Sequence, residues 1–193
     1  MKLLVATQNR GKAGEIAELL AGLSVEVVTL ADIAPDLDTP ETGTTFAENA
    51  RQKAVAAAQV TGLLTLADDS GLAVDALDGA PGVYSKRFAS TDEERVAKML
   101  GLLLELPDIQ RTAAFHCAVC LADANGVVAE IEETAPGIII DIPRGSNGFG
   151  YDPIFQPDGF TITMAEMSMA EKNAISHRGK AFRQAAEILR GIL

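Results

Sequence analysis

The chain begins with a segment, Lys2–Lys12 (KLLVATQNRGK), whose pattern decides how the fold starts. Its first part, Lys2–Ala6, is a short apolar run that predicts a buried strand, and the polar segment Thr7–Lys12 predicts a loop. Apolar residues then recur at the spacing of a helix, at Ile16, Leu19, Leu20 and Leu23. The chain is therefore expected to open as strand, loop and helix.

The same alternation of apolar runs and polar breaks predicts further elements along the chain. Helices are expected at Phe46–Val60, with Thr44 or Thr45 as N-cap, at Thr91–Leu106, and from near Ser176 to near Leu193. Extended segments are expected at Val25–Leu30, Leu63–Ala67, Leu72–Ala76, Thr112–Leu121, Val127–Thr134 and Gly137–Ile142. This order of elements predicts an α/β or α+β protein with a mixed sheet.

Length and composition narrow the class of protein. The 193 residues fit one domain, or one domain with two lobes, because domains typically run ~100–200 residues. The hydrophobic fraction of 48% supports a substantial core, and no segment approaches the ~20 consecutive apolar residues of a membrane span. The apolar run after Lys2 is too short for a signal peptide, so a cytoplasmic protein with no membrane partner is expected.

The net charge of −11 bears on the partners of the protein. It argues against nucleic acid, because binding a phosphate backbone needs a basic surface. A free nucleotide is still compatible with this charge, since a few local lysines and a metal ion can hold a triphosphate inside an acidic protein.

The two cysteines, Cys117 and Cys120, form a single Cys-x-x-Cys motif. A zinc site would need two more ligands at suitable spacing, and His116 is the only histidine nearby. On the strand expected there, residues three apart face opposite sides. Buried or half-buried thiols are therefore predicted.

The polar segment Thr7–Lys12 has the composition of a phosphate-binding loop. It follows a strand and precedes a helix, whose first N–H groups and positive dipole end attract anions. Lys12 adds a charge, and the side chains of Thr7 and Asn9 can donate hydrogen bonds. The segment does not match the Walker A pattern, and an ordinary polar connection with an Asn turn is the alternative.

The acidic pair Asp68-Asp69 follows an apolar run and precedes Ser70-Gly71. Adjacent carboxylates at the end of a strand are costly unless a cation or a proton neutralises them. On a strand they would point to opposite faces, so one of them at most would reach a given metal directly. The alternative is a turn in which an aspartate caps backbone N–H groups.

Charged residues also flank the helix predicted at Phe46–Val60. Glu48 and Lys53 are five residues apart, which is poor spacing for an ion pair on a helix, and Glu48 alone is expected to be a cap or a solvated side chain. Glu41 lies in a Pro-rich loop with no evident structural duty, so it is a candidate second carboxylate for a metal.

Two aromatic residues lie between glycines in the segment Gly148–Pro153. Glycine lets a backbone approach a ligand closely, and the ring of Phe149 or Tyr151 offers a face on which a base can stack. The alternative is a tight turn with a buried aromatic side chain.

The segment Ser176-His177-Arg178 begins the last predicted helix, where Ser176 can serve as N-cap. His177 and Arg178 then lie in the first turn, where a cation opposes the helix dipole. This cost indicates that the two side chains face an anion or a base.

At these residues the chain resembles the inosine/xanthosine triphosphate pyrophosphatases, which hydrolyse non-standard purine nucleoside triphosphates. The resemblance covers Leu3 to about Arg190. The stretches that carry it are Ala6–Lys12, Thr42–Ala50, Ala67–Val74, Gly79–Tyr84, Gly148–Phe155 and Glu171–Lys180. It implies an α/β fold with an elongated mixed sheet flanked by helices, two lobes with a substrate cleft between them, and a homodimer.

The resemblance also implies roles for individual residues. Glu41 and Asp69 would be ligands of Mg²⁺, with Asp68 as a further candidate, and Asp69 would also be the proton acceptor. Residues that would contact the nucleotide are Thr7, Gln8, Asn9, Arg10, Gly11, Lys12, Lys53, Ser70, Phe149, Gly150, Tyr151, Asp152, Lys172, His177 and Arg178. The expected reaction releases a nucleoside monophosphate and pyrophosphate from ITP, dITP or XTP.

Two other functions fit the same residues. One is a related pyrophosphatase that acts on modified pyrimidine or methylated nucleotides, and the other is a regulatory module that binds a nucleotide without turnover. The pair Asp68-Asp69 argues against the second, because binding alone does not require a positioned base.

Overall fold

The computed structural model describes residues 2–7, 10–104, 106 and 111–192, and these fall into two compact units. Unit 1 comprises Met1–Asp69, Cys117–Glu133 and Arg178–Leu193. Unit 2 comprises Ser70–His116 and Thr134–His177. Each unit has a buried apolar core of its own.

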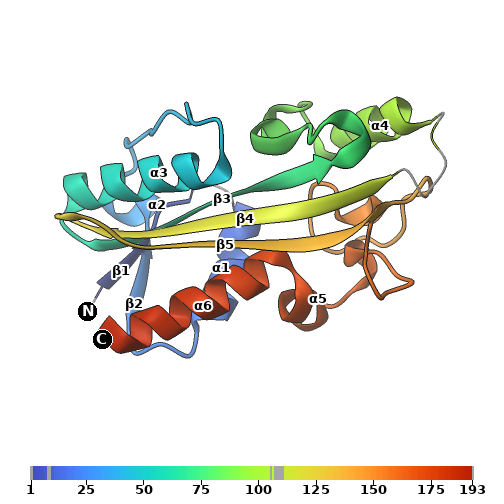
Figure 1. Cartoon of the computed structure of the whole chain (residues 1–193). Coiled ribbons are helices and arrows are strands. Elements are labelled where there is room, and N and C mark those ends of the chain that lie inside the picture. The colour runs from blue at the N-terminus through green and yellow to red at the C-terminus, as the bar shows by residue number, and fades with distance from the viewer. Residues whose placement is uncertain (1, 8–9, 105, 107–110, 193) are drawn as a thin grey trace. The chain divides into compact units, whose positions relative to one another are not determined.

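The strands form a six-stranded sheet in the order β2-β1-β3-β4-β5-β6 (Figure 1). Their bounds are β1 (Lys2–Val5), β2 (Glu26–Thr29), β3 (Leu64–Val74), β4 (Thr112–Asp123), β5 (Gly126–Ile139) and β6 (Phe155–Pro157). Strand β1 pairs in parallel with β2 and β3, whereas β5 pairs antiparallel with β6. The expected α/β fold with a mixed sheet is thus confirmed.

The helices follow the sequence-based expectations closely. They are α1 (Arg10–Leu20), α2 (Leu30–Ile33), α3 (Phe46–Thr61), α4 (Asp92–Leu103), α5 (Met169–Ile175) and α6 (His177–Ile192). Thr45 and Thr91 are the N-caps of α3 and α4, and each accepts a hydrogen bond from the backbone of a glutamate three residues on. The short helices α2 and α5 were not predicted, because one or two turns carry too little periodicity to register.

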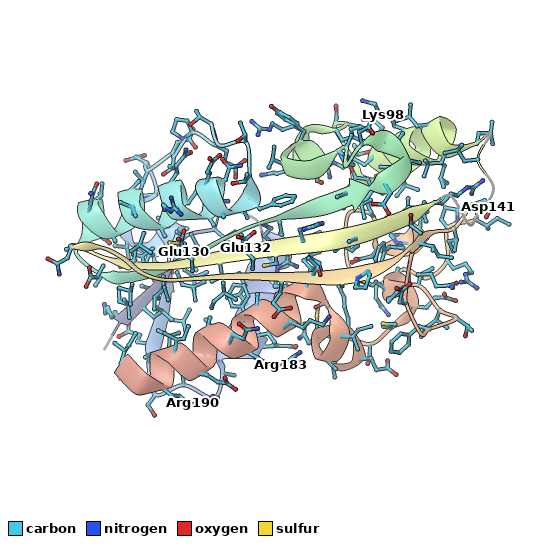
Figure 2. All side chains as sticks on the ribbon, viewed as in Figure 1. Lys98, Glu130, Glu132, Asp141, Arg183 and Arg190 are labelled. Atoms are coloured by element: carbon cyan, nitrogen blue, oxygen red, sulfur yellow. The ribbon has the colours of Figure 1, made fainter. Side chains whose placement is uncertain are left out.

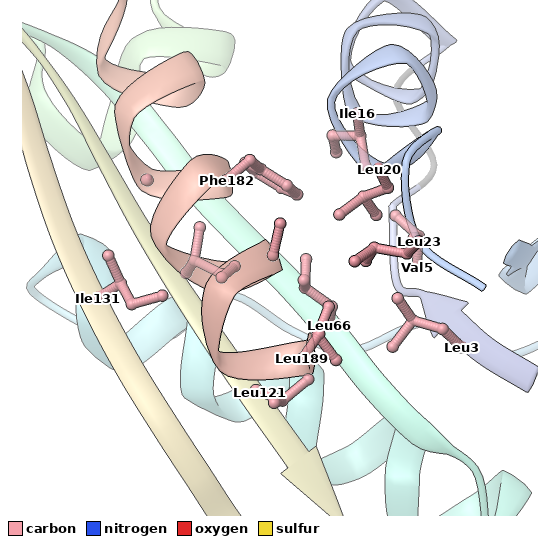
Figure 3. Packing of buried hydrophobic residues seen from close by; sticks show 14 of the residues in the cluster. Leu3, Val5, Ile16, Leu20, Leu23, Leu66, Leu121, Ile131, Phe182 and Leu189 are labelled. Atoms are coloured by element: carbon pink, nitrogen blue, oxygen red, sulfur yellow. The ribbon is translucent and has the colours of Figure 1, made fainter. Parts of the chain in front are cut away.

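In unit 1, alternate residues of the strands feed two cores on opposite faces of the sheet. Leu3 and Val5 of β1 join α1 and α6 in one core, whose residues Ile16, Leu20, Phe182 and Leu189 are labelled in Figure 3. Leu4 and Ala6 join the alanine-rich face of α3 in the other core. Cys117 and Cys120 of β4 divide between these two cores, as predicted, and both are buried thiols.

Strand β3 differs from its predicted form. A strand was expected to stop at Ala67 before the acidic pair, but β3 continues through Asp68 and Asp69 to Val74. Its parallel neighbour β1 ends at Val5, opposite Leu66, so the two carboxylates lie just past the end of β1. Cationic side chains neutralise both carboxylates there, which lets a regular strand carry them into a buried region.

The core of unit 2 gathers around β3, β4, β5 and α4. Phe115 packs edge-on against Phe155, with ring centroids 4.7 Å apart, and α4 contributes Met99 and Leu103. Two strands were predicted at Val127–Thr134 and Gly137–Ile142, but the structure has the single strand β5.

The joining of these two strands has a steric reason. Pro136 lacks an N–H, yet its carbonyl accepts a hydrogen bond from the Asp158 N–H, and the pairing with β6 begins only at Gly137. A Cβ atom on Gly137 would lie 2.4 Å from the Gln156 carbonyl oxygen, so the close approach of β6 requires glycine at this position.

Charged side chains of both signs lie on the surface, and Figure 2 labels six exposed ones on α4, β5, α6 and the segment after β5. Glu130 of β5 receives two hydrogen bonds from Arg51 of α3, at 2.8 and 2.9 Å. Among the helices of the described residues, none has the length and apolar character that crossing a membrane requires.

Candidate active site

The predicted phosphate loop links β1 to α1 in unit 1. The Thr7 N–H donates to the Val5 carbonyl at 3.0 Å, and α1 begins at Arg10. Gln8 and Asn9 lie outside the described residues, as do the side chains of Arg10 and Gly11. The structure therefore confirms the order strand, loop and helix, whereas the contacts of these side chains with phosphate stay predictions.

The acidic pair points to opposite faces of β3, as predicted. Asp68 meets cations from α1 and α6, with Lys12 Nζ at 2.9 Å and Arg178 Nε at 3.7 Å from its Oδ2 atom. Asp69 meets α3 instead, where it accepts hydrogen bonds from Asn49 and Lys53. The two adjacent carboxylates thus belong to two separate clusters.

Asp68 is the more deeply buried of the two. Burial raises the pKa of its carboxyl, but Lys12 and Arg178 more than reverse this, and the pKa lies well below the usual value. Arg178 also donates to Glu15 of α1, which is itself buried. The cluster of Glu15, Arg178, Asp68 and Lys12 therefore alternates in charge, so each buried charge in it lies beside an opposite one.

The second cluster joins Glu41, Lys53 and Asp69. Lys53 Nζ lies 3.0 Å from Glu41 Oε1 and 3.2 Å from Asp69 Oδ1. Burial raises the pKa of Asp69 above its usual value, and Lys53 offsets only part of that effect. A carboxylate with a raised pKa is a stronger base than an exposed aspartate, as the role of proton acceptor demands.

The second cluster also bears on metal binding. Glu41 and Asp69 already share one cation, the Lys53 ammonium, so an oxygen atom of each carboxylate faces the same cation position. Within the described residues no group of three His, Cys, Asp or Glu side chains forms a metal site. Two carboxylates suit Mg²⁺, which usually keeps several waters and takes further oxygens from a substrate phosphate. The residues present therefore fit this ion.

The aromatic loop lies in unit 2, between β5 and β6. Asp152 is its anchor, because its Oδ2 atom accepts from the Phe149 N–H at 2.9 Å and from Lys172 Nζ at 2.7 Å. The Lys172 ammonium also lies 5.0 Å from the centroid of the Phe149 ring. Lys172 thus lies beside Phe149 and Asp152, which were predicted from another segment.

The two aromatic residues of this loop differ in exposure. Tyr151 is buried, and its hydroxyl donates to the Ser85 carbonyl at 3.1 Å. Tyr151 therefore matches the alternative of a buried aromatic side chain in a tight turn, whereas Phe149 is only half-buried. The Gly150 N–H donates to Asp92 of α4 at 2.8 Å, and Arg95 also pairs with Asp92.

His177 and Arg178 are adjacent but belong to different units. Helix α6 begins at His177, directly after Ser176. In unit 2 the His177 ring stacks on Phe115, with centroids 4.8 Å apart and planes 9° apart. In unit 1 the Arg178 guanidinium is held by Glu15 and Asp68, so these carboxylates are the anions that its place at a helix start predicted.

Three further polar residues hold the predicted site residues and were missed in the sequence. They are Asn49, Glu15 and Asp92. Asn49 gave the clearest signal, because an amide in the first turn of a helix that is otherwise rich in alanine is out of place unless it has a partner. In the sequence, Glu15 and Asp92 look like ordinary solvent-exposed acidic residues of a helix. Their sequence neighbours therefore did not indicate that they hold other site residues.

Comparison with known proteins matches residues 3–188 to the model of the Ham1 family. The chain is 49% identical to a dITP/XTP pyrophosphatase of Desulforamulus reducens over 98% of this chain and 96% of that protein. It is 50% identical to a dITP/XTP pyrophosphatase of Gloeobacter violaceus, over 94% and 91% of the two chains. Among solved structures, a HAM1 protein from Coxiella burnetii superposes with a TM-score of 0.88 at 44% identity, over 99% of each chain. This chain therefore belongs to the Ham1 family.

Proposed function

We propose that this protein hydrolyses the non-standard purine nucleotides ITP, dITP and XTP to a nucleoside monophosphate and pyrophosphate. Relatives named dITP/XTP pyrophosphatase match nearly the whole chain at close to half identity, which supports this activity. The observation in the structure that carries the proposal is the cluster of Glu41, Lys53 and Asp69, where two carboxylates share a cation and one of them has a raised pKa.

In this proposal Glu41 and Asp69 hold Mg²⁺, and Asp68 does not. The ion supplies electrostatic stabilisation of the charge that develops on the phosphate oxygens when it is bound. Asp68 faces the opposite side of β3 and is neutralised by Lys12 and Arg178, which supports a structural role for it beside the phosphate loop.

The residues of unit 1 would act on the triphosphate. Asp69 orients a water molecule and accepts its proton for attack at the α-phosphorus, and its buried carboxylate retains the basicity for this step. Lys12, Lys53 and the N-terminus of α1, with Thr7, Gln8, Asn9, Arg10 and Gly11, bind the phosphates and stabilise the departing pyrophosphate.

The residues of unit 2 would act on the base and sugar, and Ser70, the first residue of this unit, would also contact the substrate. Phe149 offers a ring on which a base can stack, and Gly150, Tyr151 and Asp152 shape the loop around it. His177 and Lys172 are donors that can meet the 6-oxo group of hypoxanthine or xanthine, whereas the 6-amino group of adenine would leave a donor unpaired. Arg178 is assigned to the base by the resemblance, and its ion pairs with Glu15 and Asp68 support a second role in the phosphate end.

The proposal also includes a single two-lobed domain, a homodimer and a cytoplasmic location. The two lobes and the homodimer rest on the resemblance, and the location rests on the sequence pattern alone. Sedimentation of the purified protein at several concentrations tests the homodimer.

The test of the activity is a panel of purified nucleotides with Mg²⁺, in which orthophosphate and pyrophosphate are measured separately. We expect rapid release of pyrophosphate from ITP, dITP and XTP, with ATP and GTP far poorer. Stepwise orthophosphate release or equal rates on ATP would contradict the proposal. A preference for modified pyrimidine nucleotides, or binding without turnover, would favour one of the two other functions.

A further inference from the structure

Asn49 is a fully buried amide that connects the proposed metal ligand Asp69 to Gly43, two residues after Glu41. It lies in the first turn of α3, and none of its surface is exposed. Asparagine is a poor helix former, and a buried amide is costly unless its donor and its acceptor both find partners. The position therefore calls for two hydrogen bonds in fixed directions.

Both bonds are present and they lead to two separate parts of the metal cluster. The Gly43 N–H donates to Asn49 Oδ1 at 2.8 Å, two residues after Glu41. Asn49 Nδ2 donates to Asp69 Oδ2 at 3.1 Å. The orientation of the amide is unambiguous, because a backbone N–H can only donate and an ionised carboxylate can only accept.

The arrangement completes a closed loop of contacts. Lys53 joins Glu41 to the Oδ1 atom of Asp69, while Asn49 joins Gly43, two residues further on, to the Oδ2 atom. Both oxygens of Asp69 are thus held from α3. Lysine has a long flexible side chain, whereas the short amide side chain of Asn49 is fully buried and has far less rotamer freedom.

Gly43 is the counterpart that makes this contact fit. A Cβ atom at residue 43 would lie 2.6 Å from Glu48 Cβ and 2.8 Å from Asn49 Oδ1. Any other residue would push the 41–43 segment away from the amide. The sequence thus supplies a matched pair, Gly43 and Asn49.

We propose that Asn49 is a positioning residue for metal binding, which sets the Asp69 carboxylate and the segment that carries Glu41 in fixed relation. This rests on the proposed function for the identity of the reaction, but the arrangement of the two carboxylates is independent of it. Groups that hold metal ligands typically affect metal affinity or activity by ~10–100-fold.

The primary test is Asn49→Ala, with Mn²⁺ as a probe of the site. Binding of Mn²⁺ to the nucleotide-free protein is followed by the loss of the free-ion electron paramagnetic resonance signal. We expect the Mn²⁺ affinity to fall by ~10–100-fold and the kcat for dITP to fall in parallel, with the KM for dITP at saturating metal changed far less.

The matched control is Gln52→Ala, also on α3. Gln52 accepts hydrogen bonds from Thr42, next to Gly43, but its contacts do not include Asp69. We expect Mn²⁺ affinity within about threefold of the wild type for this variant. An equal loss in both variants would mean that anchoring the 41–43 segment is sufficient, and would overturn the role of the bond to Asp69.

A second variant guards against loss of the fold. Gly43→Ala leaves the core of α3 intact and disturbs the same contact from the less buried side, and it should weaken Mn²⁺ binding in the same direction. Thermal unfolding is measured for each variant. A folded Asn49→Ala protein with normal Mn²⁺ affinity overturns the proposal, as does normal affinity in Gly43→Ala if Asn49→Ala does not fold.

The experiment distinguishes failure of the proposed function from failure of the proposed role of Asn49. A wild-type protein that binds Mn²⁺ but releases no pyrophosphate from dITP would remove the proposed activity. The Mn²⁺ titrations of the variants would still decide whether Asn49 positions the two carboxylates.

Discussion

The two units hold their predicted site residues in different ways. In unit 1 the charged residues assigned to phosphate and metal whose side chains are described pair with opposite charge from another element, as Lys12 does with Asp68 and Lys53 with Asp69. In unit 2 the residues assigned to the base include the ion pair of Lys172 with Asp152, and backbone hydrogen bonds and ring contacts also hold them.

In the proposed reaction this difference would separate two tasks. A triphosphate is the same in every substrate, and charge is what binds and stabilises it, so the charged clusters of unit 1 suit catalysis on any nucleotide. Bases differ in donors, acceptors and shape, so the directional contacts of unit 2 suit discrimination. Variants in unit 1 should therefore slow all nucleotides, whereas variants in unit 2 should change the selectivity among nucleotides.

The largest effect is expected for Asp69→Asn. The change keeps the shape but removes the charge that binds metal and the basicity that activates water, so turnover should fall by roughly 10³-fold or more for all nucleotides. The fold should persist, because burial already disfavours the charge of Asp69. Pyrophosphate release and circular dichroism measure the two properties, and near-normal activity would remove Asp69 from the mechanism.

Lys53→Ala should have the next largest effect. Loss of its ammonium should slow every nucleotide by about 10²-fold, because it acts on the shared phosphates. The ratio of kcat/KM for ITP to that for ATP should stay near the wild-type value. Lys12→Ala is the companion variant in the same unit. A change in selectivity in either variant would contradict the assignment of unit 1 to the phosphates and unit 2 to the base.

The pH dependence of stability sharpens the description of unit 1. The pKa of Asp68 is lower in the folded protein than the ordinary value of 3.8, because Lys12 and Arg178 outweigh its burial. Its stabilising effect is therefore complete above pH ~4 and is lost as the pH falls through the folded pKa. Urea unfolding should show wild type more stable than Asp68→Asn at pH 6 by on the order of 1–3 kcal/mol, with the gap smaller at pH 3. A constant gap would mean that charge is not its source.

His177→Ala should give the smallest loss but the clearest change in selectivity. Removal of a donor to the base should lower kcat/KM for ITP and XTP by roughly tenfold more than for ATP. The ring also stacks on Phe115, so thermal unfolding must be measured alongside. Equal slowing of ITP and ATP would assign His177 to packing or phosphate binding, and the base-binding role of unit 2 would lose its main support.

Much of the fold could be predicted from local patterns. The helices α3, α4 and α6 carry strong periodicity and clear caps, and their predicted starts agree with the structure. The course of β3 and β5 could not, because acidic residues and proline usually end a strand. Whether they do so depends on partners elsewhere in the chain, such as Lys12 for Asp68.

For the candidate site, too, local sequence patterns predicted some features and contacts between distant residues decided the others. The sequence by itself determined the family resemblance, the polar loop after the first strand, and the opposite facing of Asp68 and Asp69, since these follow from residue type and strand periodicity. Only the tertiary structure decided that Lys53 lies between Glu41 and Asp69, that Arg178 pairs with Glu15 far along the chain, and that Asn49 holds Asp69. Burial makes such pairing necessary, but the chain offers many candidate partners, and packing alone selects among them.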